Sequence, residues 1–132
     1  PWDNDFRAIY ASIRERVLAI AGGIPGEHAT LPLQGCGHFL VEAAVRSLVP
    51  PGGKLLILRN GSYAERAVRL ATEAGRIVVG IEGPDTRPVG AEAIAAALAA
   101  DPAIGHVLAV HNETGSGIVN DPAVVGAAVR AA

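Results

Sequence analysis

The chain has 132 residues, of which 50% are hydrophobic and only 4% aromatic, and its formal net charge is −2. That length fits one domain with a substantial core, and the charge gives no reason to expect a nucleic-acid partner or an acidic membrane. No run reaches the roughly 20 apolar residues of a membrane span. The single cysteine excludes an internal disulfide framework and is typical of a cytoplasmic protein.

Predicted helices and strands alternate from the start of the chain. We expect a helix over 6–21, with Asp3 in the capping segment before it, because apolar residues recur there at helical spacing. An extended, strand-like run over 29–34 leads into a second helix over 37–48. After a Pro-Pro-Gly-Gly turn, the wholly apolar run over 54–58 predicts a buried parallel strand.

The second half repeats this alternation. We expect a helix over 63–74, a strand over 76–81, an alanine-rich helix over 91–100 and a strand over 106–111. A last helix begins at Asp121-Pro122, because proline is favoured in the first turn. The pattern predicts an α/β fold in three αβα layers, with a mainly parallel sheet of four strands.

Three polar segments follow predicted strands, with the sequences QGCGH (34–38), NGSY (60–63) and HNETGSG (111–117). In an open α/β sheet, ligands bind beyond the carboxyl ends of the strands, and a helix that begins there attracts phosphate. The segments therefore predict a site for a phosphate-bearing ligand at one sheet edge. The plain alternatives are a simple strand-to-helix turn at 34–38 and a half-buried packing role for Tyr63.

Two other kinds of chemistry are not expected. Cys36 and His38 lie two residues apart with no third group to orient them, which argues against a nucleophilic pair. The four histidines lack the i, i+4 and Cys-x-x-Cys spacings of zinc ligands, so no metal site is predicted.

The segments 33–43 (LQGCGHFLVEA), 60–66 (NGSYAER) and 111–117 (HNETGSG) together resemble the class V aminotransferases, which belong to the pyridoxal-phosphate (PLP) enzymes of fold type I. The resemblance is greatest to 2-aminoethylphosphonate–pyruvate transaminases, and next to alanine–glyoxylate (serine–pyruvate) transaminases. Residues 2–6 (WDNDF) also resemble the segment before their large domain. The resemblance spans essentially the whole chain and implies a partial large domain of that fold.

The resemblance also implies roles for individual residues. Cys36, Gly37 and His38 match the triplet that cradles the cofactor phosphate, Tyr63 matches the aromatic residue stacked on the pyridine ring, and Thr114 matches the hydroxyl residue near the phenolic oxygen. PLP is thus the expected cofactor. Cys36 departs from the usual serine, and a thiol is a weaker donor to phosphate.

In that family, three further groups lie later in the chain: the lysine that links to the cofactor, the aspartate that pairs with the pyridine nitrogen, and the substrate-binding arginine. The only lysine here is Lys54, which matches an ordinary surface lysine, so the chain alone is expected to be inactive. The chain starts at Pro1 and has no methionine, which also suggests a fragment. We therefore expect residues 1–132 to be the N-terminal portion of the large domain, with an entry helix in 1–22 and an αβα core in 28–132.

The implied parent is a cytoplasmic homodimer that transfers the amino group of a small donor, 2-aminoethylphosphonate, to the 2-oxo acid pyruvate. Three alternatives remain open. The parent could be an alanine–glyoxylate or serine–pyruvate aminotransferase, or the chain could be a non-catalytic module that binds a phosphate ligand. A desulfurase-like lyase is the third, although such enzymes more often carry Thr and His in the first loop.

Overall fold

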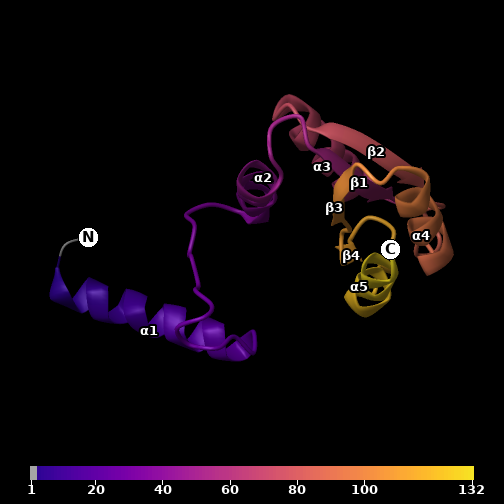
Figure 1. The fold of residues 1–132 in the computed structure, drawn as a ribbon. Helices are drawn as coiled ribbons and strands as arrows, with labels where there is room; N and C mark the ends of the chain where they lie inside the picture. Colours follow the sequence, from indigo (N-terminus) through magenta and orange to yellow (C-terminus); the bar gives the residue numbers. More distant parts are fainter. Residues whose placement is uncertain (1–2) are drawn as a thin grey trace. The chain divides into compact units, whose positions relative to one another are not determined.

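The computed structural model describes residues 3–132 and divides the chain into two compact units, the first ending at Cys36 and the second beginning at Gly37 (Figure 1). Trp2, part of the segment with the N-terminal resemblance, lies outside the described residues. Within the described part, no helix has the length and apolar character needed to cross a membrane.

The first unit contains helix α1 (Asn4–Ile20). The Asp3 carboxylate begins it, since Oδ1 accepts from the amides of Asp5 at 2.8 Å and Phe6 at 3.1 Å, which confirms the predicted cap. The helix is followed by Gly22 in the left-handed region, with φ of 68°. The apolar residues at helical spacing are all exposed: Phe6, Ile9, Ile13, Val17 and Ile20.

The strand-like run over 29–34 is not a strand, and the prediction of four parallel strands was wrong by this one element. A strand needs a neighbour to accept its hydrogen bonds. Within the described part of the first unit, an isolated bridge between Pro25 and His28 is the sole β-pairing, so 29–34 has no strand to pair with. Pro32 also removes one donor from the run.

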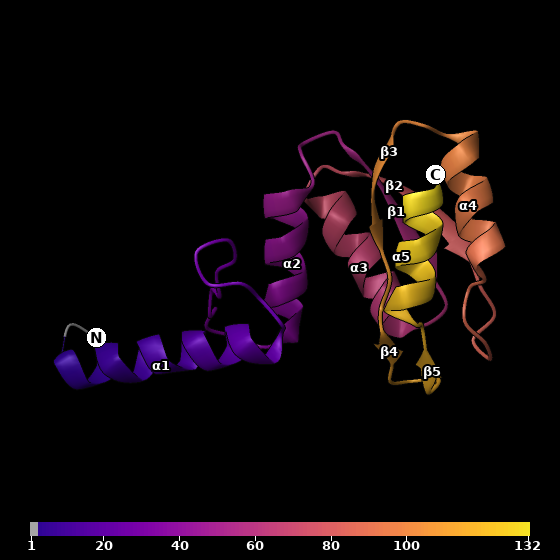
Figure 2. The same cartoon turned by 60° about the horizontal axis from the view of Figure 1, so that its bottom comes forward.

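The second unit is built on a parallel sheet in which β1 (Lys54–Arg59) lies between β2 (Ile77–Glu82) and β3 (Ile104–Leu108) (Figure 2). The side chains of residues 55–58 are all buried, because helices cover both faces of the central strand. This confirms the buried strand that the apolar run predicted.

Two helices cover each face of this sheet. Helices α2 (Gly37–Leu48) and α3 (Ser62–Glu73) pack on Leu55 and Ile57 of β1. The opposite face carries α4 (Ala91–Ala100) and α5 (Pro122–Ala131), which pack on the alternate residues Leu56 and Leu58 (Figure 2). The three αβα layers are therefore as predicted.

A short antiparallel hairpin follows β3, formed by β4 (Asn112–Glu113) and β5 (Ile118–Val119). Its strands have two residues each and so carry no readable periodicity, which is why the sequence predicts only a polar loop here. Gly117, with φ of 75°, lets the chain turn back into β5.

Candidate functional site

The polar loops after β1 and β3 meet at one edge of the sheet, because these strands run parallel and both end there. The contact is a buried pair of amides. Asn60 Nδ2 donates to Asn120 Oδ1 at 2.9 Å, and Asn120 Nδ2 donates to the carbonyl of Val110 at 2.6 Å. Both asparagines are only 2% exposed, so these bonds fix the ends of the hairpin segment against β1.

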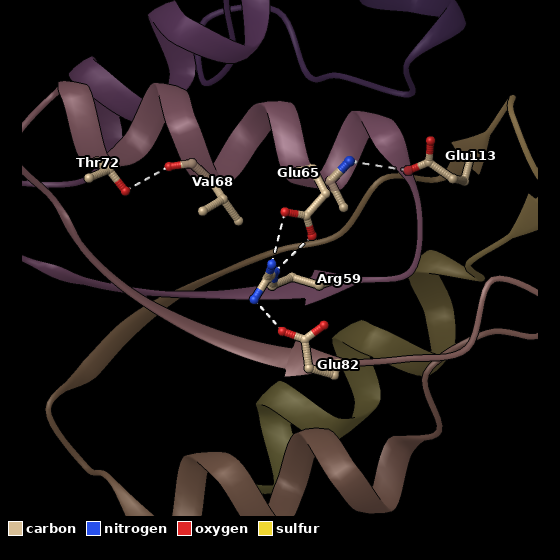
Figure 3. Close-up of polar contacts among 7 residues, drawn as sticks. Arg59, Glu65, Val68, Thr72, Glu82 and Glu113 are labelled. Atoms are coloured by element: carbon tan, nitrogen blue, oxygen red, sulfur yellow. Dashed lines mark hydrogen bonds and ion pairs between the residues drawn. The ribbon is translucent and has the colours of Figure 1, made fainter.

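The Glu113 side chain joins the hairpin to the start of α3. Its Oε1 accepts from the amide of Tyr63 at 2.9 Å, and its Oε2 accepts from the amide of Ala64 at 3.1 Å. Figure 3 shows Glu113 beside the start of α3, with one of these two bonds drawn. Glu113 is fully buried. The N-cap residue of α3 is Gly61, which has no side chain to accept these bonds. The carboxylate therefore caps this helix from a distant part of the sequence.

Tyr63 and Thr114, two of the residues predicted to contact a cofactor, are brought together by this cap. Thr114 directly follows Glu113, in a turn where Gly117 N donates to the Glu113 carbonyl at 2.8 Å. A Cβ on Gly115 would lie 3.6 Å from Ser62 Oγ, so the turn packs against the first residue of α3. Tyr63 is 47% exposed, and the Arg66 guanidinium lies 5.6 Å from the centre of its ring.

Gly37 and His38, two of the predicted phosphate contacts, are the first residues of α2. Helices α2 and α3 both pack on the face of the sheet that carries Leu55 and Ile57, and both run antiparallel to β1, one leading into it and one away from it. Their N-termini therefore lie at the same edge (Figure 2). Gly37 is exposed and His38 half-buried.

Cys36, the remaining predicted phosphate contact, is the last residue of the first unit, and its thiol is free and exposed. The structure thus gathers Tyr63 and Thr114 through Glu113 and places Gly37 and His38 at the same sheet edge. Cys36 is described only within its own unit.

A charged cluster lies beside α3, where Arg59 stands between Glu65 and Glu82 (Figure 3). Arg59 donates to both carboxylate oxygens of Glu65, at 2.8 and 2.9 Å, and also contacts Glu82. The bond from Arg59 lowers the pKa of the Glu65 carboxyl, and the same bond raises the pKa of Arg59. This cluster ties α3 to β1 and β2 through one guanidinium shared by two carboxylates.

Lys54 lies at the amino end of β1, which is the opposite edge of the sheet. Its Nζ is 2.5 Å from Asp101 Oδ2, and this hydrogen bond lowers the pKa of the aspartate. The amine is therefore separated from Tyr63 and Thr114 by the length of the strand.

Glu113, Asn60 and Asn120 were not given individual roles by the sequence. The only local signal is the glycine of the Asn60-Gly61-Ser62 segment, which leaves the start of α3 without a side chain of its own at the N-cap. Which residue supplies the acceptor depends on a contact between positions 50 residues apart, which no local pattern encodes.

No protein-family model matches the chain. It is 47% identical to the 2-aminoethylphosphonate–pyruvate transaminase of Rhizobium meliloti (strain 1021) over 119 residues, which are 90% of this chain and 31% of that protein. It is 44% identical to the enzyme of that name from Pseudomonas aeruginosa PAO1, again over 90% of the chain and 32% of the relative. The chain thus spans about a third of the length of these curated relatives.

Solved structures agree with the sequence relatives. Pyridoxamine–pyruvate aminotransferase from Mesorhizobium loti matches 98% of this chain and 32% of its own, with a TM-score of 0.88 and 27% identity. Alanine–glyoxylate aminotransferase from Nostoc sp. gives a TM-score of 0.86 at 26% identity, over 98% of this chain and 33% of its own. The resemblance to class V aminotransferases is confirmed, as is the fold class of a partial fold type I domain.

Proposed function

We propose that this relative of the 2-aminoethylphosphonate–pyruvate transaminases is the N-terminal part of the cofactor-binding domain of such an enzyme. In this proposal residues 1–22 are the entry helix segment and 28–132 the αβα core. The single observation that carries it is the edge at which Tyr63, Thr114 and the start of α2 lie together, in a chain 47% identical to enzymes of that name. The lower identity of the alanine–glyoxylate neighbour makes that activity the second candidate.

The residues at this edge fit a phosphate-bearing aromatic cofactor such as PLP. Glu113 already fills the N-terminus of α3, whereas within residues 37–132 no side chain caps the first turn of α2. The free amides of α2 and its dipole would hold a phosphate there, with Gly37 allowing close approach and the Cys36 and His38 side chains as further donors. The half-exposed Tyr63 ring offers a stacking face, and the Thr114 hydroxyl a donor for a ring oxygen.

When bound, PLP supplies the electron sink that amino transfer needs. The residues of this chain would bind its phosphate, orient its ring and hold a proton at the Thr114 hydroxyl. The amine that links to the cofactor would come from the parent protein beyond Ala132, since Lys54 lies at the opposite edge in an ion pair. The exposed apolar stripe of α1 supports a homodimeric parent.

A chimera tests the proposed activity. The matching 119 residues of the Rhizobium meliloti relative are replaced by those of this chain, and formation of alanine from 2-aminoethylphosphonate and pyruvate is measured. We expect kcat/KM within about tenfold of the relative, a loss of about 1.4 kcal/mol in transition-state stabilisation at most. The same chimera carrying Tyr63→Ala should bind PLP about tenfold more weakly, since a well-stacked aromatic pair contributes about 1.4 kcal/mol.

The proposal would be contradicted by a chimera that forms no alanine although it matches the relative in size-exclusion elution volume and in PLP affinity. If it transfers amino groups only from alanine to glyoxylate, the second candidate is correct. The coding sequence after Ala132 gives an independent check: an aspartate on the next strand and a later lysine are expected, and a stop codon would favour a stand-alone binding module.

A further inference from the structure

Glu113 is the most completely buried charged side chain at this edge. It is not among the residues proposed to contact the cofactor. It is fully buried, and both carboxylate oxygens accept backbone amides of α3. Hydrogen bonds to a carboxylate are among the stronger ones in proteins, and a buried carboxylate is retained only where such bonds satisfy it. The neighbouring Gly61 provides the space, since a Cβ there would lie 1.9 Å from Glu113 Cγ.

The two ends of this interaction are the two predicted ring contacts. One donor is the backbone amide of Tyr63 itself, and the residue that follows Glu113 is Thr114. The hairpin bearing Thr114 is held on its other side by the buried Asn60–Asn120 pair. A single carboxylate therefore ties the backbone that carries Tyr63 to the backbone that carries Thr114, in segments 50 positions apart.

The same bonds distinguish the N-termini of α2 and α3, the two helices on the face of the sheet that carries Leu55 and Ile57. In α3 the amides of Tyr63 and Ala64 are already bonded to an internal carboxylate. In α2 no side chain of residues 37–132 takes that position. An incoming phosphate meets a carboxylate at one helix and free amides at the other.

We propose that Glu113 is a positioning residue for the cofactor ring: it locks Tyr63 and Thr114 at a fixed separation and closes α3 to anions, so that the phosphate group binds at α2. This inference rests on the proposed function, because it assigns Glu113 a role in the same site. Glu113 has no contact of its own with the ligand, and it acts through the backbone of its neighbours.

Amide hydrogen exchange of the 132-residue chain tests, without any ligand, whether Glu113 accepts from the amides of Tyr63 and Ala64. First-turn amides of a helix lack helical partners and exchange fast unless something accepts from them. We expect Tyr63 and Ala64 to exchange at least about tenfold more slowly than His38 and Phe39. Glu113→Gln places an amide NH₂ against one donor, so Tyr63 or Ala64 should then exchange about tenfold faster. The matched control Glu65→Gln, on the same helix, should leave both rates unchanged.

Ligand-binding measurements then distinguish a positioning role of Glu113 from a purely structural one. Pyridoxamine 5′-phosphate is the probe, because it has no aldehyde to react with Lys54, and inorganic phosphate reports on α2 alone. Glu113→Gln should weaken pyridoxamine 5′-phosphate binding about tenfold, as expected for a lost ring contact, and leave phosphate binding unchanged. A merely structural role would weaken both ligands equally, and that result overturns the inference.

The two possible failures have different signatures. If Tyr63 and Ala64 exchange as fast as His38 and Phe39 in the wild-type chain, the inference is wrong whatever the ligand does, even where Glu113→Gln does not fold. If those amides are protected but the wild-type chain binds pyridoxamine 5′-phosphate no better than phosphate, the proposed function fails, and Glu113 is only a helix cap.

Discussion

Gly61→Ala is expected to lower the free energy of unfolding by about 3 kcal/mol or more, since it combines overpacking with the loss of buried bonds to a carboxylate. The added Cβ would lie 1.9 Å from Glu113 Cγ and 2.2 Å from Cδ, so the side chain must leave its place. Tyr63 and Ala64 then lose their acceptor. The backbone at Gly61 is extended, with φ of 167°, so the cost comes from the collision and not from backbone strain.

Urea denaturation measures the free energy of unfolding of Gly61→Ala, with Gly90→Ala as the matched control. Gly90 is also the N-cap of a helix, α4, but nothing lies within 4 Å of a Cβ built on it. The control should stay within about 1 kcal/mol of wild type. Equal stabilities for the two variants would show that Glu113 is not held against Gly61.

Arg76→Ala is expected to cost about 3 kcal/mol, because it leaves several buried carbonyls without a donor. Arg76 is 9% exposed, and its guanidinium donates to three carbonyls at the C-terminal ends of α2 and α3, those of Arg46, Val49 and Ala74. A cation there also complements the negative ends of both helix dipoles.

Thermal or urea unfolding at neutral pH checks the Arg76 prediction. Arg76→Lys should recover only part of the loss, since one ammonium cannot reach three carbonyls in the planar geometry of the guanidinium. The control Arg87→Ala, in an exposed loop, should change stability by less than about 0.5 kcal/mol. A loss at Arg76 no greater than at Arg87 would contradict the structure of this contact.

Arg76 and Glu113 satisfy backbone groups at helix ends on opposite edges of the sheet. The arginine binds carbonyls where α2 and α3 end, and the glutamate binds amides where α3 begins. On the face of the sheet that carries Leu55 and Ile57, the N-terminus of α2 has no such side-chain partner in residues 37–132.

Elements with local signals were predicted well from the sequence. The helix over 91–100 agrees at both ends, and the helix over 37–48 does as well. The apolar run after the Pro-Pro-Gly-Gly turn predicted β1, because a strand buried on both faces needs apolar residues throughout. Asp121 caps α5 as expected, accepting from the amide of Ala123 at 2.8 Å.

Features that depend on distant partners were not predicted. The run over 29–34 has strand-like residues, but pairing needs a neighbouring strand that local composition cannot supply. The tie between Glu113 and α3 joins positions 50 apart, and the Asn60–Asn120 pair joins positions 60 apart. The loops after β1 and β3 were correctly placed at one edge by strand order, while the bonds that hold them there required the structure.

The most direct test of the central claim is an amide chemical-shift map of the chain titrated with pyridoxamine 5′-phosphate, with pyridoxamine as the control without phosphate. We predict that the phosphate compound shifts the amides of residues 35–39 together with those of Tyr63 and Thr114. Pyridoxamine should leave 35–39 unchanged. If 35–39 do not respond at millimolar ligand, or respond equally to both compounds, the start of α2 is not a phosphate site and the assignment of a PLP-binding edge is wrong.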